Sequence, residues 1–177
     1  MNPLFDSLHK EAVLRVVCAI SFVVATIASL APASASDALP DTGSAKLAAY
    51  QVCHPLASID MGAAGSETFT ECNGIVKNLG GQNTLDNLSI HCAENASARP
   101  EGYRYSGTCV QTDADEDKLF MTYEGSGVGK IIWIGGTGKY KDISGTGNLG
   151  VVVAPGGTSS SFAYTLTYDV SWPHKAK

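Results

Sequence analysis

The feature that most constrains the fold is a succession of short strand-like stretches with no link long enough for a crossover helix. β-branched, aromatic and alternating apolar residues mark the stretches, and Gly, Pro, Asn and Asp mark turns such as 62–65, 95–101 and 113–117. Without crossover helices, we expect sequential strands to pair antiparallel. The predicted strands are Leu47–His54, Thr68–Asn78, Leu85–Ala93, Gly102–Thr112, Lys118–Glu124, Lys130–Ile134, Asn148–Ala154 and Ser161–Trp172.

The last predicted strand shows the clearest alternation of residue types. One face carries Phe162, Tyr164, Leu166, Tyr168 and Val170, and the other carries Ala163, Thr165, Thr167 and Asp169. A charge is costly to bury without a partner, so the aromatic face is expected inside. Amphipathic strands of this kind bury their apolar faces by closing into a ring, which also removes the sheet edges. We therefore predict an all-β fold, a single closed eight-stranded antiparallel barrel.

The stretch Val128–Val153, VGKIIWIGGTGKYKDISGTGNLGVVV, has strand formers on both sides of a glycine-rich centre. We expect Gly135–Gly147 to be a compact turn, with glycines at positive φ or at close backbone approaches. Gly145, Gly147 and Gly150 match the dinucleotide-binding spacing, but the valines that follow predict a strand where that motif requires a helix. Gly138-Lys139 is similar to a phosphate-binding loop, but Tyr140 stands where Ser or Thr is required. Phosphate binding is therefore not predicted.

The run Asp113–Gly147 contains the acidic turn DADED, the strand LFMTYEG and the stretch IIWIGGTGKYKDISGTG. This run resembles bacterial members of the allene oxide cyclase and dirigent barrel group, and GGTGKY is its most distinctive part. The resemblance implies an eight-stranded, calycin-like antiparallel barrel with a central cavity. In the plant members, which are frequently trimeric, the cavity binds a hydrophobic substrate and steers its cyclisation or coupling. The resemblance carries over no catalytic residue, so none is assigned.

Residues 1–35 have the pattern of a signal peptide. Lys10 and Arg15 precede the apolar run Val16–Leu30, and Ala33-Ser34-Ala35 matches a cleavage site. A membrane anchor is the alternative, but the run is shorter than the roughly 18–20 residues that span a bilayer. We predict a signal peptide over 1–35, a flexible lead-in over 36–46 and the barrel domain over 47–177. The protein is then exported, periplasmic or extracellular, with no membrane span after cleavage.

Cleavage would leave four cysteines, Cys53, Cys72, Cys92 and Cys109, which in an exported domain predict two disulfides. Four cysteines allow three connectivities. We prefer Cys53–Cys72 and Cys92–Cys109, because each pair would join sequential strands. A zinc site is less favoured, since there is no C-x-x-C motif and export favours oxidation.

The charge of the chain indicates which partners to exclude. The sequence has 12 basic and 17 acidic residues, a net charge of −5. No cluster of Lys or Arg could neutralise several phosphates in a row, so nucleic acid is not a predicted partner.

Asp113, Asp115, Asp117 and Glu124 stand at positions 1, 3, 5 and 12 of the EF-hand calcium loop. Position 6 of that loop requires glycine and is Lys118 here, and the residues after it predict a strand that carries Glu124 away. We favour an acidic, solvated hairpin turn, with the three aspartates as the metal-binding alternative. No cofactor is predicted.

Candidate ligand-binding residues are the aromatics Tyr105, Tyr123, Trp133 and Tyr164, which are expected to point into the barrel. Simple packing is the favoured interpretation of these aromatics, because side chains nearly fill a barrel of eight strands, and ligand binding is the alternative. His91 has no titratable partner at motif spacing, so a surface or structurally bonded histidine is expected rather than a general base. No G-x-S-x-G motif of a serine hydrolase is present in 36–177.

Three function classes remain. A non-enzymatic protein that binds a small hydrophobic molecule comes first, because the barrel supplies a cavity and no catalytic constellation is visible. An isomerase or cyclase that steers its substrate by cavity shape comes second, on the resemblance. A structural envelope protein comes third. An inward carboxylate near Tyr105 or Tyr123 would favour catalysis. The inward aromatic face of the last strand favours a monomer, and the opposite orientation would favour a homotrimer.

Overall fold

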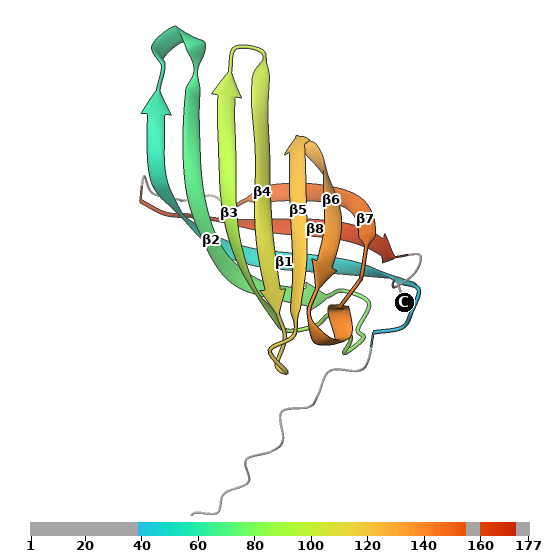
Figure 1. Ribbon diagram of the computed structural model, residues 1–177. Helices are drawn as coiled ribbons and strands as arrows, with labels where there is room; N and C mark the ends of the chain where they lie inside the picture. Colours follow the sequence, from blue (N-terminus) through green and yellow to red (C-terminus); the bar gives the residue numbers. More distant parts are fainter. Residues whose placement is uncertain (1–38, 155–159, 173–177) are drawn as a thin grey trace, which may run out of the picture. The chain divides into compact units, whose positions relative to one another are not determined.

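The computed structural model describes residues 39–154 and 160–172, which form eight strands and two short 3₁₀ helices (Figure 1). The predicted signal peptide over 1–35 lies outside the described residues. Within the described ranges, no helix is long and apolar enough to cross a bilayer. The elements are β1 (Gly43–Asp60), η1 (Gly62–Ala64), β2 (Ser66–Asn78), β3 (Leu88–Arg99), β4 (Gly102–Thr112), β5 (Lys118–Ser126), β6 (Val128–Gly136), η2 (Gly138–Tyr140), β7 (Gly145–Val153) and β8 (Phe162–Trp172).

The strands form a closed antiparallel barrel, which confirms the predicted fold class. Each strand pairs with its neighbours in sequence, and β8 pairs with β1 to close the ring. At this seam, Gly43 lies opposite Trp172 and Cys53 lies opposite Phe162. In Figure 1, β1 and β8 run side by side behind β3, β4 and β5. Because the first and last strands pair with each other, neither remains as an edge strand.

The aromatic face of β8 points into the barrel, as predicted. Asp169 on the opposite face is exposed. Burying one large apolar side chain contributes about 1.5–3 kcal/mol, so this face of β8 is a substantial part of the core. Its side chains with 4% exposure or less are Tyr164, Leu166, Tyr168, Val170 and Trp172.

Four cysteines form a row on the inner face of β1 to β4. In the register of the sheet, Cys53 lies opposite Cys72, Cys72 opposite Cys92, and Cys92 opposite Cys109. The disulfides are Cys53–Cys72 and Cys92–Cys109, which confirms the preferred pairing. The Cα atoms of each bonded pair are 4.1 Å apart, the close spacing of an antiparallel pair without mutual hydrogen bonds. The backbone N–H and C=O of a strand residue both point to the same neighbouring strand. Cys72 and Cys92 therefore direct theirs toward each other, and they form the hydrogen-bonded pair, with the wider Cα spacing, between the two disulfides.

β3 and β1 are longer than predicted. β3 continues to Arg99, although 95–101 was expected to be a turn, and β1 begins at Gly43, inside the expected lead-in. The extra part of β3 is rich in Ala, Ser and Asn, which are weak strand formers. Pairing with β2 on one side and β4 on the other keeps this part extended, so tertiary context overrides local propensity.

The link between β2 and β3 contains Leu85, which was predicted to begin a strand. Leu85 instead has a φ of 59° and is fully buried in the core. Asp86 fixes this link, because its carboxylate accepts hydrogen bonds from the Asn78 backbone N–H (2.8 Å) and from Lys77 Nζ (2.8 Å). A side chain that looked like part of a strand therefore fills one end of the barrel.

The glycine-rich turn between β6 and β7 is shorter than the predicted range. Gly135 and Gly138 have positive φ values of 126° and 49°, but Gly145 and Gly147 already belong to β7. The strand that follows these glycines confirms that the dinucleotide-like spacing does not open a helix.

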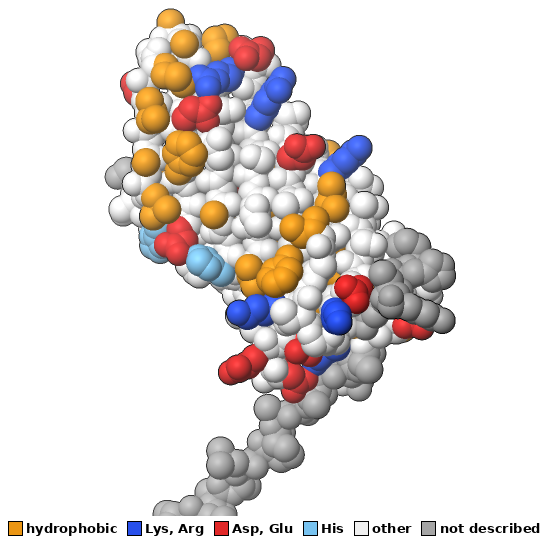
Figure 2. Space-filling view, in the orientation of Figure 1, with side chains coloured by type: hydrophobic (Ala, Val, Ile, Leu, Met, Phe, Trp, Pro, Cys, Tyr) orange, Lys and Arg blue, Asp and Glu red, His pale blue; other side chains and the backbone are white. Residues whose placement is uncertain are grey.

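The outer face over β2 to β6 carries separate groups of hydrophobic side chains, with charged side chains between them (Figure 2). Phe69 and Ile75 of β2, and Ile132 and Ile134 of β6, are each more than 40% exposed. The inward orientation of β8 therefore does not leave the outside uniformly polar.

Candidate functional site

A pocket of about 240 Å³ lies inside one end of the barrel, against β3, β4, β5, β7 and β8. Tyr103 and Val153 are 53% and 60% exposed at its opening, whereas Tyr123 and Tyr164 are 3% and 4% exposed. Glu94 is its one charged lining residue among those the structure describes. The pocket is lined by Glu94, Tyr103, Tyr105, Tyr123, Gly127, Val151, Val153, Phe162, Tyr164 and Leu166.

Larger hollows lie on the outer face of the barrel. One of them, about 840 Å³, is lined by side chains such as Lys46, Asn148 and Asp169 together with apolar ones such as Ile132. Open hollows of this kind exclude little water. The inner pocket is more enclosed and mainly apolar, with a few convergent polar groups, which is typical of small-molecule sites.

Gly107 brings the polar groups of the pocket together. In the register of the barrel, Glu94 of β3 lies opposite Gly107 of β4, and Gly107 lies opposite Tyr123 of β5. A Cβ atom at Gly107 would lie 2.5 Å from the Tyr123 ring carbon Cζ and from its hydroxyl oxygen. The missing side chain leaves space on the inner face for the phenol ring. Glu94 and Tyr123, two strands apart, can therefore meet above β4.

The Glu94 carboxylate accepts two hydrogen bonds from tyrosines. The Tyr123 hydroxyl donates to Glu94 Oε2 at 2.5 Å, and the Tyr164 hydroxyl donates to the same oxygen at 2.9 Å. Tyr164 belongs to β8, so the second hydrogen bond spans the inside of the barrel. Hydrogen bonds to a carboxylate are stronger than those between neutral groups, so they position both phenols well.

The electrostatics of the pocket keep its phenols protonated. Burial raises the pKa of Tyr123, and the neighbouring Tyr164 and Glu94 raise it further. Burial and the charge of Glu94 raise the pKa of Tyr164 as well. The same two causes act in the same order on Tyr105 and raise its pKa. At neutral pH these side chains are therefore hydrogen-bond donors, and Glu94 Oε2 accepts from two of them.

Tyr105 forms part of the pocket wall near its opening. Its hydroxyl donates to the Gly127 carbonyl oxygen at 3.0 Å, which ties β4 to the turn between β5 and β6. Its ring centroid lies 6.1 Å from that of Tyr103 and 6.2 Å from that of Tyr123. Three aromatic rings of β4 and β5 thus form one continuous wall.

Three of the four predicted ligand-binding residues, Tyr105, Tyr123 and Tyr164, line the pocket. Trp133 does not line this pocket. It is 1% exposed within the core, and its ring centroid lies 5.5 Å from that of Trp172. The tryptophan points inward as expected, but at a level of the barrel that side chains fill.

Glu94 is a candidate site residue that was not predicted from the sequence. It lies two residues after Cys92 on the inner face of β3, directly beyond the predicted end of that strand at Ala93. Extending the alternation from Cys92 by one more step would have placed Glu94 inside. The inward carboxylate near Tyr123, stated above as the feature that would favour catalysis, is present.

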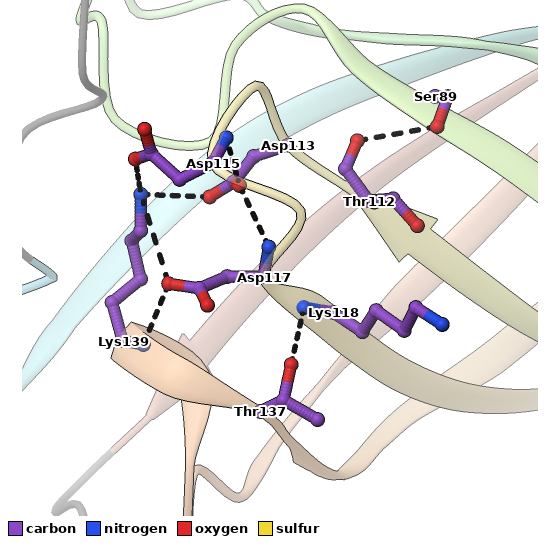
Figure 3. A network of polar contacts seen from close by, with 8 residues as sticks. All are labelled: Ser89, Thr112, Asp113, Asp115, Asp117, Lys118, Thr137 and Lys139. Atoms are coloured by element: carbon purple, nitrogen blue, oxygen red, sulfur yellow. Dashed lines mark hydrogen bonds and ion pairs between the residues drawn. The ribbon is translucent and has the colours of Figure 1, made fainter.

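The acidic turn between β4 and β5 brings Asp113, Asp115 and Asp117 together around Lys139 of η2 (Figure 3). Lys139 Nζ lies 2.8 Å from Asp113 Oδ2 and 3.9 Å from Asp117 Oδ2, and it also contacts Asp115 Oδ2. Glu124 is instead on β5 opposite Lys130. The ammonium group thus takes the central position among the aspartates, which supports the hairpin-turn interpretation, but Asp113 is buried rather than solvated as expected. These ion pairs give the lysine of the GGTGKY turn a structural role.

The turn is also internally hydrogen-bonded. Asp113 Oδ1 accepts from the backbone N–H groups of Asp115 (2.9 Å) and Asp117 (3.1 Å). Burial raises the pKa of Asp113, but the hydrogen bonds from Lys139, Tyr140 and these backbone groups outweigh burial and lower it overall. The GGTGKY turn therefore ties two hairpin ends together, which is a structural role.

His91 has a structural partner on the outer face. Its Nε2 lies 2.7 Å from Glu71 Oε1, and both side chains are largely exposed. This geometry confirms the expectation of a surface histidine. His91 does not line the inner pocket.

No protein-family model matches this chain, and no curated protein matches it. Among solved structures, the barrel is similar to the pterocarpan synthase dirigent protein PsPTS1, with a TM-score of 0.50 and 11% sequence identity. That match covers 78% of this chain and 100% of the other. The pterocarpan synthase dirigent protein GePTS1 gives a TM-score of 0.49 and 12% identity, over 78% of this chain and 90% of the other. The match to PsPTS1 shows that the barrel is dirigent-like in fold.

Proposed function

We propose that this protein binds a small, mainly apolar molecule in the inner pocket. The observation that carries the proposal is a partly enclosed space of about 240 Å³ with aromatic and aliphatic walls and one polar network, Glu94 with Tyr123 and Tyr164. Pockets for drug-sized ligands have volumes of roughly 300–1,000 Å³, so the ligand here is smaller. The dirigent-like fold supports the proposal, because it supplies a barrel with an interior cavity.

We further propose that binding takes place outside the cytoplasm, in the periplasm or the extracellular space. Two disulfides in one small domain are typical of exported proteins. The signal-like pattern over residues 1–35 points the same way.

The binding proposal can be tested with the neutral fluorescent probe N-phenyl-1-naphthylamine, which brightens in apolar surroundings. Val151→Trp fills the pocket, since Val151 lines it. Val152→Trp is the matched control, because the next residue of β7 is 69% exposed on the outer face. We expect the wild type and Val152→Trp to enhance the probe's fluorescence and Val151→Trp to lose most of the enhancement. Equal enhancement in the two folded variants would contradict the proposal.

A second candidate function is a cavity-steered isomerase or cyclase, allene oxide cyclase-like or dirigent-like. The observation in its favour is a carboxylate that lies 2.5 Å and 2.9 Å from two phenol hydroxyls inside the pocket. Such a group can accept a proton while the phenols donate hydrogen bonds to a developing negative charge. The similar solved structure named a synthase gives this class a precedent on the same fold. No specific observation favours a structural envelope protein.

Glu94→Gln distinguishes binding from catalysis. It keeps the shape of the side chain but removes the proton acceptor. The molecules carried by exported wild-type protein and by this variant can be identified by mass spectrometry. A binding protein carries the same molecule in both cases, whereas an isomerase or cyclase carries product in the wild type and unreacted substrate in Glu94→Gln.

A further inference from the structure

We propose that the ligand of the inner pocket is an organic cation, an ammonium group with an apolar body. This inference rests on the proposed binding function and adds the charge and chemical class of the ligand. Two independent features of the pocket lead to it: a carboxylate without a cationic partner, and aromatic rings on both sides of that carboxylate.

The carboxylate of Glu94 has no cation to balance it. The pocket lining includes no Lys, Arg or His, and Glu94 forms no ion pair with any residue in the described part of the chain. Its hydrogen bonds from Tyr123 and Tyr164 both go to Oε2, and no hydrogen bond to Oε1 is formed within residues 39–154 and 160–172. Glu94 is only half-buried, so its Oε1 is open to a cation that enters the pocket, and a hydrogen bond between an ammonium group and a carboxylate is a strong one.

The aromatic rings form two groups around this carboxylate. One group is Tyr103, Tyr105 and Tyr123 on β4 and β5, and the other is Phe162 and Tyr164 on β8, whose ring centroids are 6.1 Å apart. The face of an aromatic ring attracts a cation, and cages of several such rings recognise alkylammonium groups. Because Glu94 binds one tyrosine of each group, it holds both groups around the same space. A phenol whose hydroxyl donates a hydrogen bond to a carboxylate has a more electron-rich ring, so the rings of Tyr123 and Tyr164 attract a cation more strongly.

The size of the pocket selects among cations. A space of about 240 Å³ is far larger than a metal ion needs, and its walls are aromatic and aliphatic apart from Glu94. Hard metal ions require several oxygen ligands, and here one carboxylate is hydrogen-bonded to two phenols. An alkylammonium ion needs no coordination shell, since its charge is spread over alkyl groups that pack against rings.

The test compares benzyltrimethylammonium with neopentylbenzene, which has the same shape with carbon in place of the charged nitrogen. Each compound competes with N-phenyl-1-naphthylamine for the wild-type pocket. We expect the ammonium to bind about tenfold more tightly than its neutral isostere, because the rings and Glu94 both attract the charge. Raising the salt concentration should weaken binding of the ammonium and leave binding of the isostere nearly unchanged.

Glu94→Gln should reduce the preference for the ammonium to about threefold or less, the part that the rings alone provide. Glu124→Gln is the matched control, because Glu124 follows Tyr123 on β5 and its side chain is exposed. This variant should keep the wild-type preference. If Glu94→Gln does not fold, the salt dependence of the wild type still tests the same charge.

Equal affinities of the wild type for the ammonium and its isostere would overturn the inference, and so would an unchanged preference in folded Glu94→Gln. Binding of the neutral probe and the isostere without a preference for the ammonium would overturn only the ligand class. Absence of any probe binding sensitive to Val151→Trp would instead overturn the proposed function, and this inference with it.

Discussion

At the scale of single residues, the candidate site depends on a side chain that is absent. Gly107 separates Glu94 from Tyr123 in the register of the barrel, and its inner face is occupied by the Tyr123 ring. Any side chain at this position would compete with the phenol for the same space. The hydrogen bond between Glu94 and Tyr123 thus depends on the absence of a side chain at Gly107, which lies between them in the sheet.

Gly107→Ala should displace the Tyr123 ring and break its hydrogen bond to Glu94, because the added Cβ would lie 2.5 Å from that ring. Overpacking of this kind typically destabilises a protein by about 1–3 kcal/mol. Urea unfolding of the variant measures the change in the free energy of unfolding.

Gly150→Ala is the matched control for this prediction. The nearest atom to a Cβ at Gly150 is the Thr167 carbonyl oxygen at 3.8 Å, an ordinary contact. We expect a change of no more than about 0.5 kcal/mol, as for most surface substitutions. Equal losses in the two variants would show that the ring does not depend on the space at Gly107.

Asp113 should make the stability of the protein depend on acid pH. Its pKa is lowered below the usual 3.8 in the folded state, since the hydrogen bonds from Lys139 and its other partners outweigh burial. A carboxyl group with a depressed folded pKa stabilises the fold above its unfolded pKa, and this stabilisation disappears as pH falls through the folded pKa.

The measurement compares the melting temperatures of the wild type and Asp113→Asn between pH 7 and pH 2. We expect Asp113→Asn to be less stable by about 1.5–3 kcal/mol at pH 7, the usual contribution of hydrogen bonds to a charged group. The gap should narrow below about pH 3.8, where the unfolded chain takes up a proton first. A gap that stays constant down to pH 2 would mean that Asp113 is not preferentially ionised in the fold.

At the scale of elements, the disulfides cross-link β1 to β2 and β3 to β4, and the acidic turn joins the β4–β5 hairpin to the β6–β7 turn. The disulfides add a covalent bond between strands that backbone hydrogen bonds already pair, and the acidic turn adds ion pairs between two hairpin ends. Gly138 contributes to the junction of these hairpin ends, because it has a φ of 49° and lies against the Asp117 carboxylate. Its position explains why a glycine precedes the lysine of this turn.

Removal of the β3–β4 disulfide by Cys92→Ser with Cys109→Ser should lower the free energy of unfolding by about 3 kcal/mol, from the entropy of closing a short loop. The bond spans a sequence separation of 17 residues, and the bond between Cys53 and Cys72 spans 19. The corresponding Cys53→Ser, Cys72→Ser variant should therefore lose a similar amount. Urea unfolding measures both losses, and two variants as stable as the wild type would contradict the expectation.

At the scale of the whole molecule, the association state follows from which faces the barrel hides. The aromatic face of β8 is inside, so it offers no apolar stripe to a second chain. We therefore predict that the barrel is a monomer at micromolar concentration, with the mass of one chain in light scattering. A mass near three times that value would show that exposed side chains such as Tyr50 and Ile75, which lie opposite each other on β1 and β2, are covered by another copy.

The sequence alone determined the features of this protein that depend on local periodicity. The alternation in β8 predicts its buried face, the turn residues predict the number of strands, and the spacing of Cys53, Cys72, Cys92 and Cys109 favours the disulfides that form. These patterns work because successive side chains of a strand point to opposite faces, so inside and outside are encoded residue by residue.

Only the tertiary structure decided which inward residues meet. Glu94 contacts Tyr123 across Gly107 and Tyr164 across the barrel, Trp133 packs in the core instead of the pocket, and Lys139 enters the acidic turn. Each of these contacts depends on the register between strands far apart in the chain. Alternation fixes the face of a side chain but not its height in the barrel, and height is what separates a pocket wall from a filled core.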